Sequence, residues 1–132
     1  MELEDLPKRI VMVGGGYIAA EFSHIAARAG AKVTVLQRAE RMLTRFDPEL
    51  VGWLIEKFLE IGIEVQTGTA VEAIERAGSG LRVRARAKSR EIAIDADLVV
   101  HAAGRAPDLD ALNLAAAGVA VEHGRIVLNE FL

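Results

Sequence analysis

The sequence predicts an α/β fold in which a parallel sheet carries helices on both faces and a three-stranded antiparallel β-meander is added. A short apolar strand leads through three glycines into an amphipathic helix and then into a second buried strand. A second helix and strand repeat this order, which is typical of a parallel sheet. Farther along the chain the apolar period changes to two, which indicates antiparallel strands. Together these observations predict a Rossmann-like fold with a meander.

The first unit joins two strands through a helix. Residues 9–13 are mainly β-branched and apolar, as expected of a central strand that is covered on both faces. Apolar residues recur at helical spacing over 17–29, and Gly30 ends that helix. The second buried strand is expected at 33–36. A right-handed crossover of about 30 residues therefore closes the unit.

The rest of the chain is expected to extend the sheet, insert the meander and return to the sheet. Asp47 and Pro48 form an N-cap and first-turn pair that opens a helix through Glu60. Two short polar segments, Gly78-Ser79-Gly80 and Lys88-Ser89-Arg90, separate the alternating stretches as turns. The other expected elements are a strand at 63–65, meander strands at 70–75, 81–87 and 91–94, a strand at 97–103, a short helix at 110–117 and a strand at 125–128.

The totals describe one domain over residues 1–132, with 52% hydrophobic and 27% charged residues. The formal net charge is -3 and the arginines are scattered among acidic residues, so nucleic acid is not an expected partner. The apolar runs are far below the roughly 18 to 20 residues that span a bilayer, and the first ten residues are too charged for a signal peptide. We therefore expect no membrane contact and a cytoplasmic location.

The chain has no cysteine, which excludes disulfides, thiolate chemistry and Cys-ligated metals from this segment. Its three histidines, His24, His101 and His123, show no spacing typical of metal ligands. We therefore expect no metal site and no catalytic residue in this segment. Redox chemistry here would need a group supplied from outside.

The glycine turn carries the main functional prediction. In the pattern Gly-x-Gly-x-x-Ala, here Gly14-Gly15-Gly16-Tyr17-Ile18-Ala19, each small residue has a separate task. Gly14 makes the sharp turn, Gly16 lets the backbone approach a pyrophosphate, and Ala19 lets the helix pack closely on the sheet. Three glycines in this place can also be a simple tight turn. The position on the first strand of a crossover favours binding of a nicotinamide dinucleotide.

The residues at the end of the second strand indicate whether the cofactor is NAD or NADP. An acidic residue there would bind the ribose hydroxyls of NAD, but this chain has Gln37 followed by Arg38. A guanidinium can pair with the 2′-phosphate of NADP, and Arg41 and Arg45 are near enough in sequence to join it. The alternative is a solvated basic loop. The residues favour NADP slightly over NAD.

Glu21 lies one turn into the helix that follows the glycines. A solvent-facing charge is the common reason for a helical glutamate, and contact with the nicotinamide is the functional alternative. The residues alone leave both interpretations open.

Two motifs resemble one family closely: Gly14-Gly15-Gly16-Tyr17-Ile18-Ala19-Ala20-Glu21-Phe22 and Ala103-Gly104-Arg105-Ala106-Pro107-Asp108. With the meander between them, the chain resembles the NAD(P)-binding domain of the pyridine nucleotide-disulfide oxidoreductases, which include glutathione reductase, dihydrolipoamide dehydrogenase and mercuric reductase. In that family the domain is inserted into an FAD domain, and hydride passes from the nicotinamide to the flavin.

The resemblance implies roles for individual residues. Residues 14–18 would hold the pyrophosphate, and Tyr17 would cover the nicotinamide pocket until the cofactor enters. Glu21 would contact the nicotinamide carboxamide, which favours the functional interpretation of that residue. Arg38 matches the arginine of NADPH-preferring members, although Thr44 stands where they often place a second arginine. Two further matched positions line the adenosine and nicotinamide sides of the site, Val71 and Gly104 respectively.

The resemblance also implies what surrounds this domain. The family's FAD motif, redox disulfide and dimerisation domain are not among these 132 residues, and the last residues resemble the stretch that returns to the FAD domain. We therefore expect a domain of a larger FAD-containing enzyme that binds NAD(P)H and does not turn over alone. The electron acceptor stays open among disulfide, lipoamide, mercuric ion and quinone. The alternatives are a stand-alone regulatory domain that senses NAD(H) and a scaffold for protein contacts.

Overall fold

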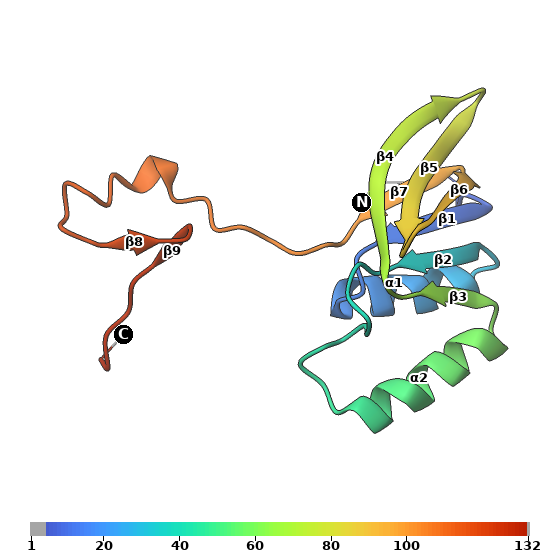
Figure 1. Ribbon diagram of the computed structural model, residues 1–132, viewed down its shortest axis with the longest axis horizontal. Coiled ribbons are helices and arrows are strands. Elements are labelled where there is room, and N and C mark those ends of the chain that lie inside the picture. Colours follow the sequence, from blue (N-terminus) through green and yellow to red (C-terminus); the bar gives the residue numbers. More distant parts are fainter. Residues whose placement is uncertain (1–4, 132) are drawn as a thin grey trace.

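The computed structural model describes residues 5–131 of the chain and shows an α/β body followed by an extended carboxyl-terminal segment (Figure 1). We call residues 5–103 the body and residues 104–131 the arm. The body contains β1 (Arg9–Val13), α1 (Tyr17–Arg28), β2 (Lys32–Leu36), α2 (Pro48–Glu60), β3 (Ile63–Gln66), β4 (Thr69–Ala77), β5 (Gly80–Ala87), β6 (Arg90–Ala96) and β7 (Leu98–His101).

Four strands of the body form a parallel sheet in the order β3-β2-β1-β7. Val13 at the end of β1 is paired with Leu36 of β2 and with His101 of β7, so these three strands end at the same level. The other three strands, β4, β5 and β6, form a separate antiparallel sheet. The α/β class, the parallel sheet and the three-stranded meander are therefore confirmed.

The two faces of the parallel sheet are covered differently from the expectation. Alternate residues of β1 and β2, such as Met12 and Val35, are buried in one cluster with both helices. The opposite residues, such as Val11 and Leu36, are buried against the meander strands β5 and β6. Both helices therefore cover one face and the meander covers the other (Figure 1). The reason is that both crossovers step in the same direction along the sheet, and right-handed connections then place their helices on the same side.

The start of α2 agrees with its expected cap. The Asp47 carboxylate accepts hydrogen bonds from the backbone N–H groups of Glu49 and Leu50, at 2.9 and 3.2 Å. Pro48 occupies the first turn, where its missing N–H costs nothing. Phe58 on the inner face of this helix is 2% exposed, so the apolar stripe packs α2 on the sheet, while the cap defines where the helix begins.

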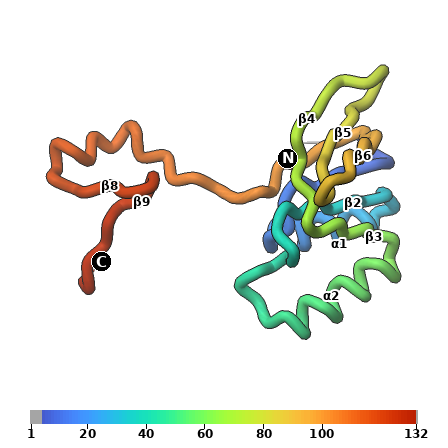
Figure 2. The backbone as a smooth tube through the Cα atoms, viewed as in Figure 1, coloured from blue at the N-terminus to red at the C-terminus, as the bar shows by residue number. Residues whose placement is uncertain are grey.

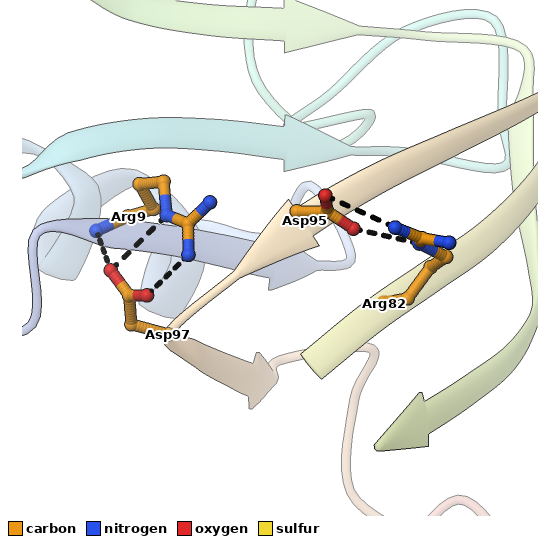
Figure 3. Close-up of polar contacts among 4 residues, drawn as sticks. All are labelled: Arg9, Arg82, Asp95 and Asp97. Carbon is orange, nitrogen blue, oxygen red and sulfur yellow. Dashed lines mark hydrogen bonds and ion pairs between the residues drawn. The ribbon is translucent and has the colours of Figure 1, made fainter. Parts of the chain in front are cut away.

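Two ion pairs lie where the meander meets the parallel sheet (Figure 3). Arg9 of β1 donates to Asp97 through its backbone N–H and its guanidinium, and the shortest distance is 2.6 Å. Arg82 of β5 pairs with Asp95 of β6 at 2.7 Å. The hydrogen bond from each guanidinium lowers the pKa of its carboxyl partner below the ordinary value. The Arg9–Asp97 pair joins β1 to the connection between β6 and β7, 88 positions apart in the sequence, whereas the Arg82–Asp95 pair joins two consecutive strands of the meander.

The arm leaves the body after Ala103 and extends away from it (Figure 2). It contains η1 (Asp110–Leu112), β8 (Val121–Glu122) and β9 (Arg125–Ile126). The expected helix at 110–117 was wrong in length, because Asn113 adopts a left-handed conformation with φ of 47° and ends the single turn. The expected strand at 125–128 is only the two residues of β9, paired with β8.

Among residues 5–131, no helix combines the length and apolar character that a membrane crossing requires. The cytoplasmic location stays a prediction.

Candidate functional site

A cavity of about 710 Å³ opens at the carboxyl ends of β1, β2 and β7. Ligands of parallel α/β sheets bind at this edge, outside the ends of the strands. The cavity is lined by the glycine turn, by the loop after β2, by the start of β4 and by the segment after β7. The residues are Val13, Gly14, Gly15, Gly16, Tyr17, Ile18, Leu36, Gln37, Arg38, Ala39, Leu43, Thr44, Arg45, Phe46, Thr69, Ala70, Val71, His101, Ala102, Ala103, Gly104 and Arg105.

The first glycine of the turn is fixed against the sheet. Gly14 has φ of 109°, a region that side chains disfavour, and its N–H donates to the Leu36 carbonyl at 2.8 Å. A Cβ built on Gly14 would lie 2.6 Å from the carbonyl oxygen of Ala102. Both the backbone angle and the close approach of β7 therefore require glycine here.

The second glycine is fixed against the loop that follows β2. A Cβ on Gly15 would lie 2.8 Å from the Cβ of Met42. The carbonyl of Gly15 accepts a hydrogen bond from the Leu43 N–H at 2.7 Å, and its own N–H donates to the Oε1 of Gln37 at 3.1 Å. Both backbone polar groups of Gly15 are thus satisfied within the protein.

The third glycine faces open space. A Cβ on Gly16 would meet nothing within 4 Å. Gly16 is the N-cap of α1, no side chain caps the helix, and the first turn holds no acidic residue. The first N–H groups of a helix have no partner within the helix, and the helix dipole adds positive potential there. Ala19 is completely buried, so α1 packs closely on the sheet. The turn therefore presents unoccupied amides to an anionic ligand.

The outer wall of the cavity is basic. Arg38 and Arg45 both line it, and neither forms an ion pair with any residue in 5–131. Arg41 does not line the cavity, because its guanidinium donates to the Thr44 carbonyl at 3.0 Å. Of the three arginines considered from the sequence, two therefore remain available to an anionic group at this wall.

The structure brings nearly all of the predicted site residues together. Gly14, Gly15, Gly16, Tyr17, Ile18, Gln37, Arg38, Val71 and Gly104 all line the cavity. Glu21 does not line it and lies exposed on α1. The contact of Glu21 with a nicotinamide stays a prediction, as do the binding roles of the others.

Phe46 and His101 are among the lining side chains that sequence reasoning missed. Phe46 follows the basic loop directly and is more than half exposed. His101 is the last residue of β7, and the rule that parallel strands end at the binding edge could have singled it out. No comparable signal marks Phe46, because its place depends on the path of the loop.

The polar groups that line the cavity are of kinds that bind anions. Among residues 5–131 no group of three or more His, Cys, Asp or Glu side chains is placed to hold a metal ion. What the cavity presents is a glycine turn, a helix N-terminus and three arginines, Arg38, Arg45 and Arg105, all suited to phosphates. The fold and the position of the glycine turn define the chain as a Rossmann-like domain.

Comparisons with known proteins narrow this class. The family model described as "Pyridine nucleotide-disulphide oxidoreductase" matches residues 1–132, and the chain belongs to this family. The chain is 35% identical to mercuric reductase of Staphylococcus aureus over 133 residues, which cover 100% of the chain and 24% of that protein. It is 34% identical to dihydrolipoyl dehydrogenase of Staphylococcus aureus over 119 residues, which cover 90% of the chain and 25% of that protein.

A solved structure gives the same result. The flavoprotein disulfide reductase RclA from Escherichia coli, in its Cu(II) complex, superimposes with a TM-score of 0.84 at 28% identity. The match covers 97% of our chain and 29% of that chain. The chain thus spans about a quarter of the length of these relatives, which are oxidoreductases by name. Members of the family use FAD and NAD(P)H.

Proposed function

We propose that this chain binds NAD(P)H in the cavity at the glycine turn and presents the nicotinamide for hydride transfer to FAD in a longer flavoenzyme. The observation that carries the proposal is the geometry of the turn. Gly14 and Gly15 are held by the protein, whereas Gly16 and the start of α1 face the open cavity. The backbone amides at the start of α1 would donate hydrogen bonds to a pyrophosphate. No capping side chain competes for them in the described residues.

The residues present fit a dinucleotide along the cavity. The amides of Gly16, Tyr17 and Ile18 would bind the pyrophosphate. Val71 would lie on the adenosine side and Gly104 on the nicotinamide side, with Tyr17 covering the nicotinamide pocket until the cofactor enters. When bound, NAD(P)H would supply the hydride, and the residues of this chain would hold and orient it. Glu21 is proposed to reach the carboxamide once the cofactor is in place.

We propose NADPH as the preferred cofactor. Arg38 and Arg45 lie on the wall of the cavity with no acidic partner in the described residues, so both can pair with a 2′-phosphate. NAD-specific sites use a carboxylate at the end of the second strand, and Gln37 stands there instead. A neutral amide does not repel the added phosphate.

We further propose that the 132 residues are one domain of a larger enzyme and do not turn over alone. The relatives are about four times as long, which supports this. FAD would be bound by parts of such an enzyme outside these residues. The electron acceptor depends on those parts as well, and the cavity supplies no argument for one acceptor over another.

The first test measures nucleotide binding by the purified chain. NADPH at 100 times its dissociation constant should add about 2.7 kcal/mol to the free energy of unfolding, visible as a thermal shift. Arg38→Ala should weaken NADPH binding by about tenfold or more and leave NADH binding nearly unchanged, because it removes a charge-assisted contact with the 2′-phosphate. Arg76→Ala, exposed on β4 near the end opposite the cavity, is the control.

Two outcomes would contradict the proposal at different levels. If neither NADPH nor NADH shifts the melting temperature, the binding function is wrong. If both bind and Arg38→Ala weakens them equally, the cavity binds a dinucleotide but the proposed preference for NADPH is wrong.

A further inference from the structure

The amide of Gln37 is hydrogen-bonded at both of its ends. Its Oε1 accepts from the N–H of Gly15 at 3.1 Å, and its Nε2 donates to the carbonyl of Arg41 at 3.2 Å. These two contacts connect the glycine turn, the end of β2 and the loop after β2. The side chain therefore bridges two parts of the protein, and its hydrogen-bonding groups at these contacts are already occupied.

The loop makes further contacts with the same glycine. The Leu43 N–H donates to the Gly15 carbonyl at 2.7 Å, and Met42 is completely buried beside Gly15. The backbone of Gln37 is held as well, because its N–H donates to Gln66 and its carbonyl accepts from Thr69, both at 2.9 Å. The backbone of Gln37 is thus fixed by hydrogen bonds to β3 and β4, and its side chain can hold the loop.

The loop has further contacts, namely the buried side chain of Leu43 and a hydrogen bond from the Gly68 N–H to the Ala39 carbonyl at 2.9 Å, but the residues that it carries to the cavity are themselves little covered. Arg38, Thr44 and Arg45 are exposed. Leu43 has φ of 50°, a conformation that costs a non-glycine residue free energy and persists only where contacts impose it. The contacts of the loop with Gln37 and Gly15 therefore contribute to the position of the basic wall.

We propose that Gln37 is a positioning residue, which holds the loop 38–45 against the glycine turn and so places Arg38 and Arg45 at the cavity, instead of contacting the ribose itself. An amide suits this role because it carries a donor and an acceptor at one end. An ionised glutamate could still accept from Gly15, but it would turn an oxygen toward the Arg41 carbonyl. A methionine at this position has a similar length but can form neither the hydrogen bond with the Gly15 N–H nor the one with the Arg41 carbonyl.

The attachment can be tested without any nucleotide by limited trypsin digestion, with each cut assigned by mass spectrometry. Gln37→Met should speed cleavage after Arg38, Arg41 and Arg45 by about tenfold, as expected when two neutral hydrogen bonds no longer oppose local opening. Cleavage after Arg125, which is exposed in the arm, should not change and serves as the internal reference.

Gln66→Met is the matched control variant. Among residues 5–131, the Gln66 side chain hydrogen-bonds to Glu64 alone, at 2.7 Å, and its backbone carbonyl still accepts from Gln37. Its loop should be cut at the wild-type rate. Gln37→Glu retains one of the two bonds and should give an intermediate rate, so it carries the test if Gln37→Met does not fold by circular dichroism. Unchanged loop cleavage in both Gln37 variants would overturn the proposal.

The second measurement rests on the proposed function. If Gln37 only positions the loop, Gln37→Glu should weaken NADPH binding and should not tighten NADH binding, both measured by calorimetry. If Gln37→Glu tightens NADH binding while loop cleavage stays at the wild-type rate, the residue contacts the ribose directly and our inference is wrong. A wild-type chain that binds neither nucleotide would contradict the proposed function, whereas the cleavage rates would still decide the attachment.

Discussion

The body and the arm use similar residues but differ completely in burial. In the body, apolar side chains on both faces of the parallel sheet are buried against helices or the meander. In the arm, no described residue is buried. Its exposed large apolar residues are Leu112, Val121, Ile126, Val127, Leu128 and Phe131. Apolar composition alone therefore does not decide whether a segment contributes to a core.

The difference follows from what each segment can pair with. A strand of the body has neighbours on both sides or a covered face, whereas β8 and β9 have only each other and two residues each. An isolated two-stranded hairpin is marginally stable at best in water. An apolar side chain stabilises a fold only when its surface is removed from water. We therefore expect the stability of the body to be insensitive to changes in the arm.

The largest expected effect compares two phenylalanines. Phe58→Ala removes a ring that is 2% exposed between α2 and the sheet, and it should lower the free energy of unfolding by about 3 to 5 kcal/mol. Phe131→Ala removes a ring that is 82% exposed and should change it by less than about 0.5 kcal/mol. Urea unfolding, followed by circular dichroism, measures both. A loss above 1 kcal/mol in Phe131→Ala would show that the arm contributes to the same cooperative unit.

The second comparison uses two glycines with left-handed backbones. Gly14→Ala combines an unfavourable φ of 109° with a Cβ that would lie 2.6 Å from the Ala102 carbonyl, so about 2 to 4 kcal/mol of stability should be lost. Gly124→Ala has a φ of 74° but meets nothing within 4 Å. Its strain falls on the arm, so the urea midpoint of the body should not move. Equal losses in the two variants would mean that backbone strain alone, without the contact to β7, accounts for Gly14.

The same contrast explains how much of the fold the sequence could predict. Every strand and both helices of the body were expected, because burial gives their residues a period of two or 3.6 or a continuous apolar run. The arm was predicted less well, since the alanine-rich stretch at 110–117 has helical composition but no surface to pack on. The placement of both helices on one face was also missed, because it depends on the order of the strands and not on any local pattern.

The residues of the candidate site also differ in how far their roles could be predicted from the sequence. The glycines could be assigned separate tasks because a positive φ or a close backbone contact restricts a position to glycine, which is visible in the sequence. Gln37 was expected at the ribose, yet its amide bridges Gly15 and Arg41. Its contact with Gly15 joins residues that are 22 positions apart and has no local signature in the sequence. Side chains whose role depends on a loop path, such as Phe46, are beyond sequence reasoning for the same reason.

The smallest expected effect is on the decrease of the unfolding free energy at acidic pH. The guanidinium of Arg9 lowers the folded-state pKa of Asp97 below its ordinary value of 3.8, so the folded chain binds fewer protons than the unfolded chain in that range. The contribution of this pair to stability is therefore complete above pH 3.8 and is lost as the pH falls through the lower pKa of the folded state. Asp97→Asn should flatten the decrease in unfolding free energy below pH 4, measured by urea titration from pH 6 to pH 2.5. The effect should be small because the pair is exposed to solvent.

Asp110→Asn, in the arm and without an ion pair among residues 5–131, should leave the profile unchanged. If Asp97→Asn retains the full acid dependence, other carboxyl groups of the body cause it, and the contact between β1 and the meander does not depend on charge.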